Sequence, residues 1–493
     1  MDWYSQESYC KDLPTKPIPE TGIILVSGAT GYIGGRLVPE LIERGYKVRV
    51  MVRSYSEEYF ERWPDAEIIV ADALKPGLLR KALKGVSVAY YLIHSMLATN
   101  QNDVESDLWA ADNFRTIAEE EKLDRIIYLG AMGECGQKWS GHLIGRMNVA
   151  KTLMEGTVPT TILRAALIIG SGSASFEILD NIVRNSPVYF IPHWAKSRCQ
   201  PIGIRDVIKY LVGVLETKET TGNAYDIGGD DILSYREMMK ILAKLLRKRR
   251  LFLPSPVSNI RFNSYIVSLI SPVPAQIVGC ILEGVKNEVV VQANTIRKHI
   301  DFKTIHFKVS LLRALSREQH DKISTRWSDA YPPAHELSMR LSELSRPPKL
   351  KSVYSILTEK DASTIFESIC QIGGKRGWFT TNWMWRMRGR IDRIFLGVGT
   401  LRGRRSANSL RINDVIDFWR VEDMIVDKKL LLRAEMRVPG KAWLEFQIEP
   451  NQQQNKLIAI AYFQPRGLAG RLYWYNFWPF HYFIFKDLLK QLS

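Results

Sequence analysis

The chain has 493 residues, enough for two to four domains at about 100–200 residues each. Hydrophobic residues make up 46% of it and charged residues 24%, which excludes a disordered or low-complexity protein and predicts a large buried core. Lys and Arg number 68 against 52 Asp and Glu, and this net charge of +16 favours an anionic partner: nucleic acid, an acidic lipid surface or a phosphorylated ligand.

Residues 1–21 are expected to form an N-terminal tail. They lack the basic start and the apolar core of a signal peptide, so secretion is disfavoured. The five cysteines are far apart, odd in number and without a CxxC pair, which fits a reducing compartment better than a disulfide framework. The eight histidines show no HxxH or HExxH spacing, so no metal site is predicted. These features favour a cytoplasmic location.

From Gly22 onward, short β-branched runs alternate with segments of helical length and spacing. This alternation predicts βαβ units and therefore a parallel sheet with helices on both faces, in a first domain that spans residues 22–344. The expected strands are Ile23–Ser27, Lys47–Val52, Glu67–Val70, Val88–Ile93, Arg125–Leu129 and Thr160–Leu163.

The strongest chemical signal is IILVSGATGYIGGRL, in which Gly28, Gly31 and Gly34 form GxxGxxG between an apolar strand and a helix. Such glycines give a tight turn, close approach of the backbone to a pyrophosphate and close packing of helix on strand, with the anion at the helix N-terminus. A second strand ends about 20 residues later, as a dinucleotide-binding unit requires. The pattern therefore predicts nucleotide binding rather than a merely structural turn.

That second strand, VRVMVRS, ends in Arg53 and Ser54 instead of an acidic residue. An Asp or Glu there would accept a hydrogen bond from the ribose 2′-hydroxyl of NAD, whereas Arg pairs with a 2′-phosphate. The sequence thus favours NADP over NAD, with an exposed loop arginine as the alternative interpretation. Asp72 follows the third strand, where a carboxylate can contact an adenine edge.

The segments SGATGYIG, VMVR, VADAL, ILRAALIIGSG and YDIGGDDILSY resemble the atypical, extended short-chain dehydrogenases/reductases, particularly their NmrA-like NAD(P)-binding branch, over roughly residues 20–330. The resemblance implies a doubly wound Rossmann fold. It also implies that the cofactor is bound at the pyrophosphate by Gly28, Thr30, Gly31, Tyr32, Ile33 and Gly34, at the adenosine end by Arg53, Ser54, Asp72 and Ala73, near the ribose by His94 and Ser95, and further by Arg164.

The wider family donates a proton from the Tyr of a YxxxK motif, with a Ser or Thr that polarises the carbonyl. This chain departs from the pattern. After the fifth strand, Gly130 and Ala131 stand where the Ser is expected, and neither carries a hydroxyl. The segment HLIGRMNVAK places His142 and Arg146 where the Tyr and Lys would stand.

Three interpretations of the chemistry stay open. His142 with Arg146 could be a non-standard proton-donor pair, although a His near a helix start is often only a polar surface residue. Hydride could instead pass to a quinone-like or conjugated compound that needs little acid help. The domain could also bind cofactor without turnover, as a redox sensor or scaffold. The predicted activity is NAD(P)H-dependent reduction of a hydrophobic carbonyl, enone or quinone-like compound.

The region from Tyr235 to Leu344 is expected to be mostly helical and to cap the ligand cleft. Within it, Phe262–Leu282 is the longest uncharged run and carries Ser-Pro-Val-Pro at its centre. We expect two apolar helices around a turn rather than a membrane span, because the prolines interrupt the helix.

Ser345-Arg-Pro-Pro-Lys is the expected linker to a second domain over residues 345–493. Alternating apolar and charged residues then predict an antiparallel meander with one wet face, followed by a long aromatic helix, Leu468–Leu492. The expected wet-face acids are Asp414, Asp417, Glu435 and Glu445.

The segments WMWRMRGRIDRIFLGVG, DVIDFWRVE and MRVPGKAWLEFQIEP resemble a bacterial domain of unknown function that is fused after such NAD(P)-binding domains. They are distantly similar to the START/polyketide-cyclase superfamily. The resemblance implies an α+β helix-grip domain with an apolar ligand.

Most of the charge excess follows Ser345, where 25 basic residues face 13 acidic ones. Lys375–Arg405 alone holds nine basic residues and one acid. Nucleic acid fits poorly because no recognition motif accompanies the charge. Anionic lipid contact at the inner face of the membrane, together with Trp378, Trp383 and Trp385, and a solvated face paired to the first domain stay open.

The final helix carries nine aromatic residues between Leu472 and Phe485. A packed core helix, the wall of a ligand cavity and an interfacial membrane anchor are the three interpretations of this run.

Overall fold

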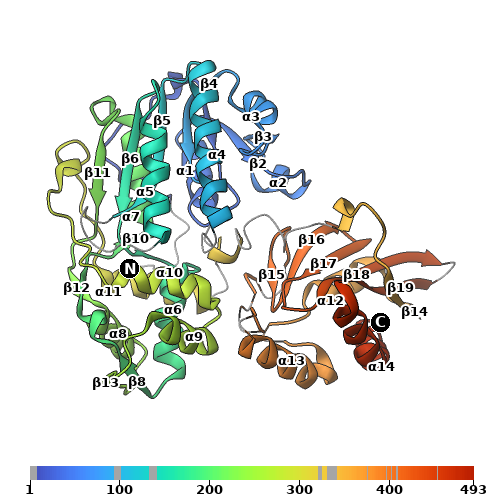
Figure 1. Cartoon of the computed structure of the whole chain (residues 1–493). Coiled ribbons are helices and arrows are strands. Elements are labelled where there is room, and N and C mark those ends of the chain that lie inside the picture. Colours follow the sequence, from blue (N-terminus) through green and yellow to red (C-terminus); the bar gives the residue numbers. More distant parts are fainter. Residues whose placement is uncertain are drawn as a thin grey trace. The chain divides into compact units, whose positions relative to one another are not determined.

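The computed structural model describes residues 8–93, 101–132, 141–319, 325–329, 341–374, 376–395, 397–400, 402, 404–406, 409–451 and 454–493; within these ranges the side chains of 101–104, 141–143, 317–319 and 343 are not described. The chain divides into two compact units (Figure 1). Unit 1 comprises residues 1–270 and 275–330, and unit 2 comprises residues 271–274 and 331–493.

Unit 1 is built on a seven-stranded sheet in the order β11-β6-β5-β4-β1-β2-β3, in which all neighbours run parallel. All six strands predicted from the sequence are present, and the predicted doubly wound α/β fold is confirmed. The strands are β1 (Ile23–Val26), β2 (Lys47–Val52), β3 (Glu67–Val70), β4 (Val86–Tyr91), β5 (Arg125–Ala131), β6 (Thr160–Ala165) and β11 (Ala224–Ile227).

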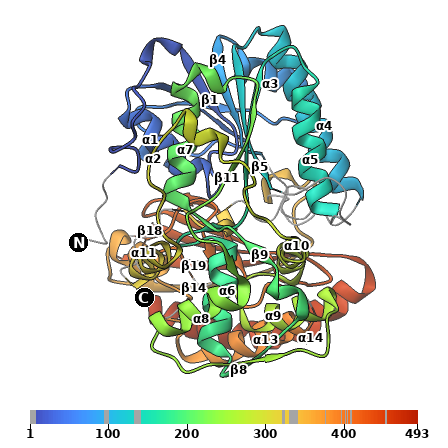
Figure 2. The ribbon, with the colours of Figure 1, turned by 90° about the vertical axis from the view of Figure 1, so that its left-hand side faces the viewer.

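Helices cover both faces of this sheet (Figures 1 and 2). One apolar core forms where α1 and α7 pack on one face, and a second forms where α3, α4 and α5 pack on the other. Strands buried on both faces read as continuous apolar runs, which is why the sequence marked them clearly. The helices are α1 (Gly34–Glu43), α2 (Glu58–Arg62), α3 (Pro76–Leu83), α4 (Gln101–Glu120), α5 (Gly141–Met154) and α7 (Ile204–Glu216).

The remainder of unit 1 is mainly helical, as the sequence predicted from Tyr235 onward. Helices α9 (Ile260–Ile270) and α10 (Ala275–Val285) flank the Ser-Pro-Val-Pro segment, which confirms two helices around a turn. In the part of the chain that the structure describes, no helix is both long enough and apolar enough to cross a membrane. The other α-helices of unit 1 are α6 (Ala174–Asn185), α8 (Tyr235–Leu245) and α11 (Phe307–Gln319), and one of its short 3₁₀ helices is η5 (Trp327–Asp329).

Three two-stranded sheets accompany these helices. Strand β10 pairs with β7 and β13 with β8 in parallel, while β12 pairs with β9 antiparallel. Their bounds are β7 (Ile168–Ile169), β8 (Val188–Ile191), β9 (Arg198–Cys199), β10 (Ile202–Gly203), β12 (Leu233–Ser234) and β13 (Leu251–Pro254).

Unit 2 contains a six-stranded antiparallel sheet in the order β14-β19-β18-β17-β16-β15. Helices α12 (Ala362–Cys370) and α14 (Gly467–Leu492) pack on it, α12 on β18 and α14 on β19 and β14. A short turn, η7 (Phe379–Thr381), leads into α13 (Asn382–Ile394). The strands are β14 (Leu350–Thr358), β15 (Val415–Ile416), β16 (Trp419–Ile425), β17 (Lys429–Ala434), β18 (Gly440–Asn451) and β19 (Gln454–Pro465).

The expectation that four acids lie on the wet face of this sheet is wrong. Glu435 is buried and forms ion pairs with Arg402 and Arg420, at 2.6 and 2.5 Å. The other three acids expected on the wet face, Asp414, Asp417 and Glu445, are also buried. Alternation of charged with apolar residues arises from a solvated face and equally from a buried face whose charges are paired.

Candidate functional site

The glycine-rich turn joins β1 to α1 and is held tightly against β4. Gly28 has φ of 67°, and a Cβ there would lie 2.5 Å from the carbonyl oxygen of Leu92. A Cβ on Gly34 would overlap the carbonyl of Gly28. The Oγ of Ser27 donates a hydrogen bond to the carbonyl of Tyr90 at 2.8 Å, which ties the end of β1 to β4. Glycine is therefore required at both positions for steric reasons.

This turn directs the N-terminus of α1 toward the carboxyl end of the sheet. The helix begins at Gly34, and its first turn contains no acidic residue. Backbone amides at a helix N-terminus, together with the positive end of the helix dipole, bind phosphate. We call the glycine-rich turn and the N-terminus of α1 the cradle. Gly28 and Gly34 place no side-chain atoms in it, so its shape and polarity fit the pyrophosphate of a dinucleotide.

Arg36 ties the turn to segments far along the chain. Its guanidinium lies 4.2 Å from the ring centre of Tyr32 and donates hydrogen bonds to the carbonyls of Ser171, at 2.9 Å, and Thr325, at 3.1 Å. Arg36 is buried, so these hydrogen bonds are shielded from water. The position of the turn therefore depends on residues that follow it by more than a hundred positions.

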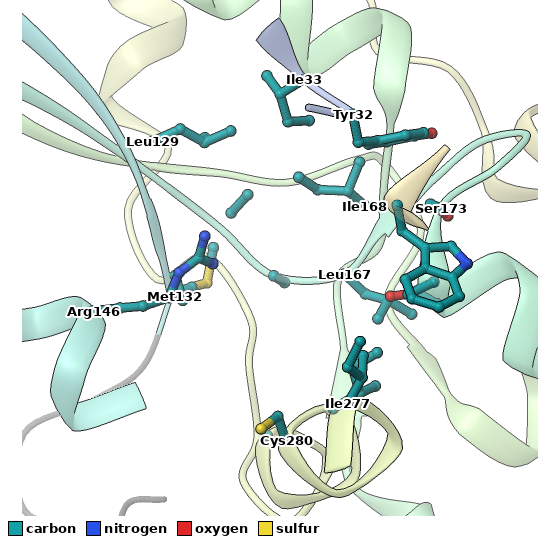
Figure 3. A pocket seen from close by; sticks show the side chains of 18 of the residues that line it. Tyr32, Ile33, Leu129, Met132, Arg146, Leu167, Ile168, Ser173, Ile277 and Cys280 are labelled. Atoms are coloured by element: carbon teal, nitrogen blue, oxygen red, sulfur yellow. The ribbon is translucent and has the colours of Figure 1, made fainter. Parts of the chain in front are cut away.

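A cavity of about 310 Å³ opens beside the turn, at the carboxyl ends of β1, β4, β5 and β6 (Figure 3). The sheet order reverses between β1 and β4, and ligands of open α/β sheets bind at such a switch point. The residues that line it are Gly28, Gly31, Tyr32, Ile33, Gly34, Leu92, Ile93, Leu129, Ala131, Met132, Arg146, Ala165, Ala166, Leu167, Ile168, Ser173, Ala174, Ser175, Cys199, Tyr235, Ile277, Cys280, Ile281, Gly284, Val289 and Trp327.

The wall is mostly aliphatic, and Arg146 is the single charged side chain among the described residues that line it. Arg146 lies on α5 beside Met132 (Figure 3). Its Nε is buried and has no hydrogen-bond partner within the described residues. The nearby Tyr128 hydroxyl donates to the backbone carbonyl of Arg146, at 3.3 Å, and not to the guanidinium. Arg146 can therefore hydrogen-bond an oxygen of a bound ligand.

Two thiols and one phenol of the wall are neutral near pH 7. Burial raises the pKa of Cys199 to about 12 and that of Cys280 to about 11, so neither thiol ionises to a nucleophilic thiolate. Burial also raises the pKa of Tyr235 well above its usual value. The described wall thus offers one fixed positive charge in an apolar surface.

A segment from the end of unit 1 closes one side of the cavity. The Nε1 of Trp327 donates to the carboxylate of Glu177 at 2.6 Å, and its backbone amide donates to the carbonyl of Gly172 at 2.8 Å. Gly172 has φ of 76°, a conformation that favours glycine. These contacts fix the indole against the start of α6, whose N-cap residue, Ser173, also lines the cavity.

The structure brings one group of the predicted site residues together around the cavity. These are Gly28, Gly31, Tyr32, Ile33, Gly34 and Arg146. Thr30 belongs to the same turn but does not line the cavity.

The residues expected at the adenosine end lie outside the cavity, at the ends of β2 and β3. Arg53 is exposed and Ser54 half-buried. The carboxylate of Asp72 accepts a hydrogen bond from the amide of Leu74 at 3.0 Å, which stabilises its own turn. The carbonyl of Ala73 accepts one from the side chain of Asn113 on α4, also at 3.0 Å.

Arg164 is engaged within the sheet. Its Nε lies 2.6 Å from the carboxylate of Asp226 on the neighbouring strand β11, and it does not line the cavity. His94 and Ser95 lie outside the described residues, and so does the side chain of His142, whose backbone belongs to α5. The roles expected for these three residues stay predictions.

Sequence reasoning missed the far wall of the cavity. Ile277 and Cys280 come from α10, and Trp327 from η5. The segment GSGS, residues 170–173, is the one local pattern that points to this wall. Its glycines and the N-capping Ser173 predict a tight turn directly before a helix. Nothing in the sequence around Trp327 indicates that it packs against α6.

Comparisons with known proteins agree with this geometry. Residues 28–165 match the family described as NAD(P)H-binding, and residues 344–488 match a family described as protein of unknown function, DUF2867. The enzyme WbmG of Bordetella bronchiseptica, solved in complex with NAD, superimposes with a TM-score of 0.50 over 62% of this chain and 96% of that one, at 13% identity. That likeness shows a shared fold alone.

Among curated relatives, divinyl chlorophyllide a 8-vinyl-reductase of Cucumis sativus is 24% identical over 264 residues, 50% of this chain. The ceramide reductase of Caulobacter vibrioides is 25% identical over 202 residues, 40% of this chain. This chain spans 62% of the length of each.

The sheet order and the glycine-rich turn give unit 1 a Rossmann fold, and residues 28–165 within it match the NAD(P)H-binding family. A DUF2867 region follows it in the same chain.

Proposed function

We propose that unit 1 is an NADPH-dependent reductase of a hydrophobic carbonyl, enone or quinone-like compound. The observation that carries the proposal is an apolar cavity beside the pyrophosphate cradle, lined by one cation, Arg146, whose buried Nε has no hydrogen-bond partner within the described residues. Relatives named as a vinyl reductase and a ceramide reductase support a reaction on a large apolar substrate.

Bound NADPH would supply the hydride. Leu129, Met132 and Ile168 would exclude water from the acceptor, and Arg146 would hydrogen-bond its oxygen. Negative charge that develops on that oxygen is stabilised strongly in an apolar cavity. An arginine remains protonated, so Arg146 would stabilise the negative charge on the acceptor oxygen without donating its proton. This arrangement suits acceptors that form a stable anion when they take up hydride. Quinones and enones have this property.

The preference for NADP is part of the proposal. Arg53 is exposed directly after β2, at the carboxyl edge of the sheet, where the adenosine ribose of a dinucleotide lies in this fold. Its guanidinium is suited to a 2′-phosphate, and no acidic side chain competes for the ribose at Arg53 or Ser54.

The test is oxidation of NADPH by the purified full chain over a panel of quinones and enones. Arg146→Gln should lower kcat/KM by about 100-fold, as loss of one oxyanion donor does, with NADPH affinity unchanged. Lys151→Gln is the matched control, since Lys151 lies on the same helix with a side chain that is 78% exposed. Turnover that survives intact in Arg146→Gln would contradict the role of Arg146.

Binding without turnover is the second candidate. The residues at the end of β5 favour it. Gly130 and Ala131 stand there, and neither carries the side-chain hydroxyl that related reductases have at this place. Tight NADPH binding with no oxidation over the whole panel would support a sensor or scaffold and exclude the reductase.

For unit 2 we propose a helix-grip, START-like fold. The six-stranded antiparallel sheet, with the 26-residue helix α14 packed on β14 and β19, supports it. Comparison of an experimental structure of this unit with helix-grip domains would test the proposal, and a different strand order would overturn it.

A further inference from the structure

Helix α13 presents an apolar stripe to solvent. Trp383, Met387, Ile391 and Ile394 follow one another at helical spacing, and each is about half exposed or more. The same helix buries charged Asp392 on its inner side. A surface helix of a globular protein ordinarily has the reverse arrangement, with its apolar stripe turned inward. The outward stripe of α13 therefore requires a partner.

Helix α14 adds a larger apolar surface. Of its nine aromatic residues between 472 and 485, six are exposed: Tyr475, Phe477, Trp478, Phe480, Tyr482 and Phe483. Trp474 and Phe485 are buried on the side that packs on the sheet. A packed core helix or a cavity wall would bury most of these rings, so the exposure favours an interfacial role.

The two helices lie side by side (Figures 1 and 2). The guanidinium of Arg388 on α13 lies 5.3 Å from the ring centre of Tyr473 and 5.7 Å from that of Phe477 on α14. The amide of Thr381, just before α13, donates to the carboxylate of Asp487 at 3.3 Å. We call the exposed residues of 383–395 and 468–486 the α13–α14 face.

The charge of this face has one sign. Its exposed cations, or those at its margin, are Arg386, Arg390, Arg466, Arg471 and Lys486. Within 376–395 and 466–486 the sequence contains one acidic residue, Asp392, which is buried and accepts hydrogen bonds from the amides of Gly399 and Arg437 at 2.9 and 2.7 Å. No exposed acid therefore opposes an anionic partner here.

We propose that the α13–α14 face docks on an anionic lipid surface. Tryptophan and tyrosine among aliphatic residues, ringed by arginine, form the composition that partitions into the headgroup region of a bilayer. An exposed apolar surface of this extent on one face marks an interaction site, and the uniform positive charge selects anionic lipid over a neutral surface.

The docking face differs from the stretch Lys375–Arg405 that the sequence first indicated. Trp378 and Trp385 are buried and stack on each other with ring centres 4.4 Å apart, so of the three tryptophans only Trp383 is exposed. Arg402 and Arg405 are also buried, in ion pairs with acids of unit 2. Residues of α14, outside that stretch, take their place.

The test uses the full chain with vesicles of phosphatidylcholine, with or without phosphatidylglycerol. The partition coefficient into the anionic vesicles, measured by sedimentation, should fall by about 5-fold for each arginine removed, hence about 25-fold for Arg386→Gln with Arg390→Gln, and should weaken with salt. Replacing Tyr475, Trp478 and Phe483 by Ser should abolish it. These side chains are exposed, so the variants should fold as the wild type does.

Matched controls lie elsewhere on unit 2. Lys351→Gln with Lys428→Gln removes two exposed charges, and Leu357→Ser with Val426→Ser removes two exposed apolar side chains. Both should sediment as the wild type does. Equal sedimentation with neutral vesicles, none with anionic ones, or an aromatic variant that loses only self-association in ultracentrifugation would overturn lipid docking; the last outcome would assign the face to a second copy of the chain.

Discussion

The guanidinium of Arg402 lies 2.6 Å from the carboxylate of Glu435, and neither side chain has any exposed surface. Arg420 and Arg433 approach the same carboxylate, at 2.5 and 3.5 Å. Two buried acids therefore serve three buried arginines in unit 2, because Glu422 also approaches Arg433, at 3.7 Å. Such an arrangement is tolerated only while its charges remain paired.

Glu435→Gln should destabilise unit 2 by about 3–5 kcal/mol, because it leaves buried guanidinium groups uncompensated. Urea denaturation followed by tryptophan fluorescence measures the loss. Glu449→Gln removes an exposed carboxylate from β18 of the same sheet and should cost little. Equal stability of the two variants would contradict the electrostatic role of Glu435.

Glu435 also predicts how unit 2 responds to acid. Burial alone would raise the pKa of Glu435, but Arg420, Arg402 and Arg433 outweigh burial and lower it. A depressed pKa contributes stability above the unfolded value, about 4.3, which is lost as the pH falls through the folded pKa. The free energy of unfolding of the wild type should therefore decrease below about pH 4.3. The Glu435→Gln variant should lack the part of this decrease that is due to Glu435.

Asp206 in unit 1 predicts the opposite pH dependence: its contribution to folding stability decreases as the pH rises. Burial raises its pKa to about 6, although the amide of Ile305 donates to its carboxylate at 2.8 Å. The stability that Asp206 contributes is present below its unfolded pKa and is lost as the pH rises through 6. Asp206→Asn should remove a pH dependence on the order of 3 kcal/mol across this window. Thermal melts of this variant and of the exposed Asp65→Asn would show it, and identical pH profiles would refute it.

Gly28→Ala should abolish nucleotide binding. The new Cβ would lie 2.5 Å from the carbonyl oxygen of Leu92, and the residue would keep φ of 67°. Gly85 has nearly the same φ, 71°, and a Cβ there would meet nothing within 4 Å, so Gly85→Ala controls for backbone strain alone. Calorimetric titration with NADPH should detect binding to the Gly85→Ala variant only. Retained affinity in Gly28→Ala would show that the turn does not hold the pyrophosphate.

Arg53→Glu should change the cofactor preference. Loss of a charge-assisted hydrogen bond to a 2′-phosphate, worth about 1.5–3 kcal/mol, corresponds to roughly 10-fold to 100-fold weaker NADPH binding. NADH affinity should stay the same or rise, since a carboxylate accepts from a ribose hydroxyl. Lys47→Glu, at the other end of β2, tests whether charge alone has this effect. A uniform loss of affinity for both cofactors would count against NADP selectivity.

The sequence predicted the Rossmann sheet well because its strands are short, its central strands are buried on both faces, and helical segments separate them. The glycine-rich turn was equally clear, since its constraints are local. Glu435 and Glu445 were misassigned to a wet face, because alternation of residue types shows the two-residue period of a strand and does not show what covers each face. Trp327 could not be placed at all, since its position depends on packing against α6, some 150 residues earlier in the chain.

Two hydrogen bonds that join distant parts of the chain, from Arg36 to Thr325 and from Trp327 to Glu177, also affect how unit 1 folds during synthesis. Domains fold as their residues leave the ribosome, beginning from the N-terminus. Both the last contact of Arg36 and the Trp327 side of the cavity then form only after residue 327 has emerged. Before that point, a nascent chain would present the apolar interior of the cavity to the surrounding solution.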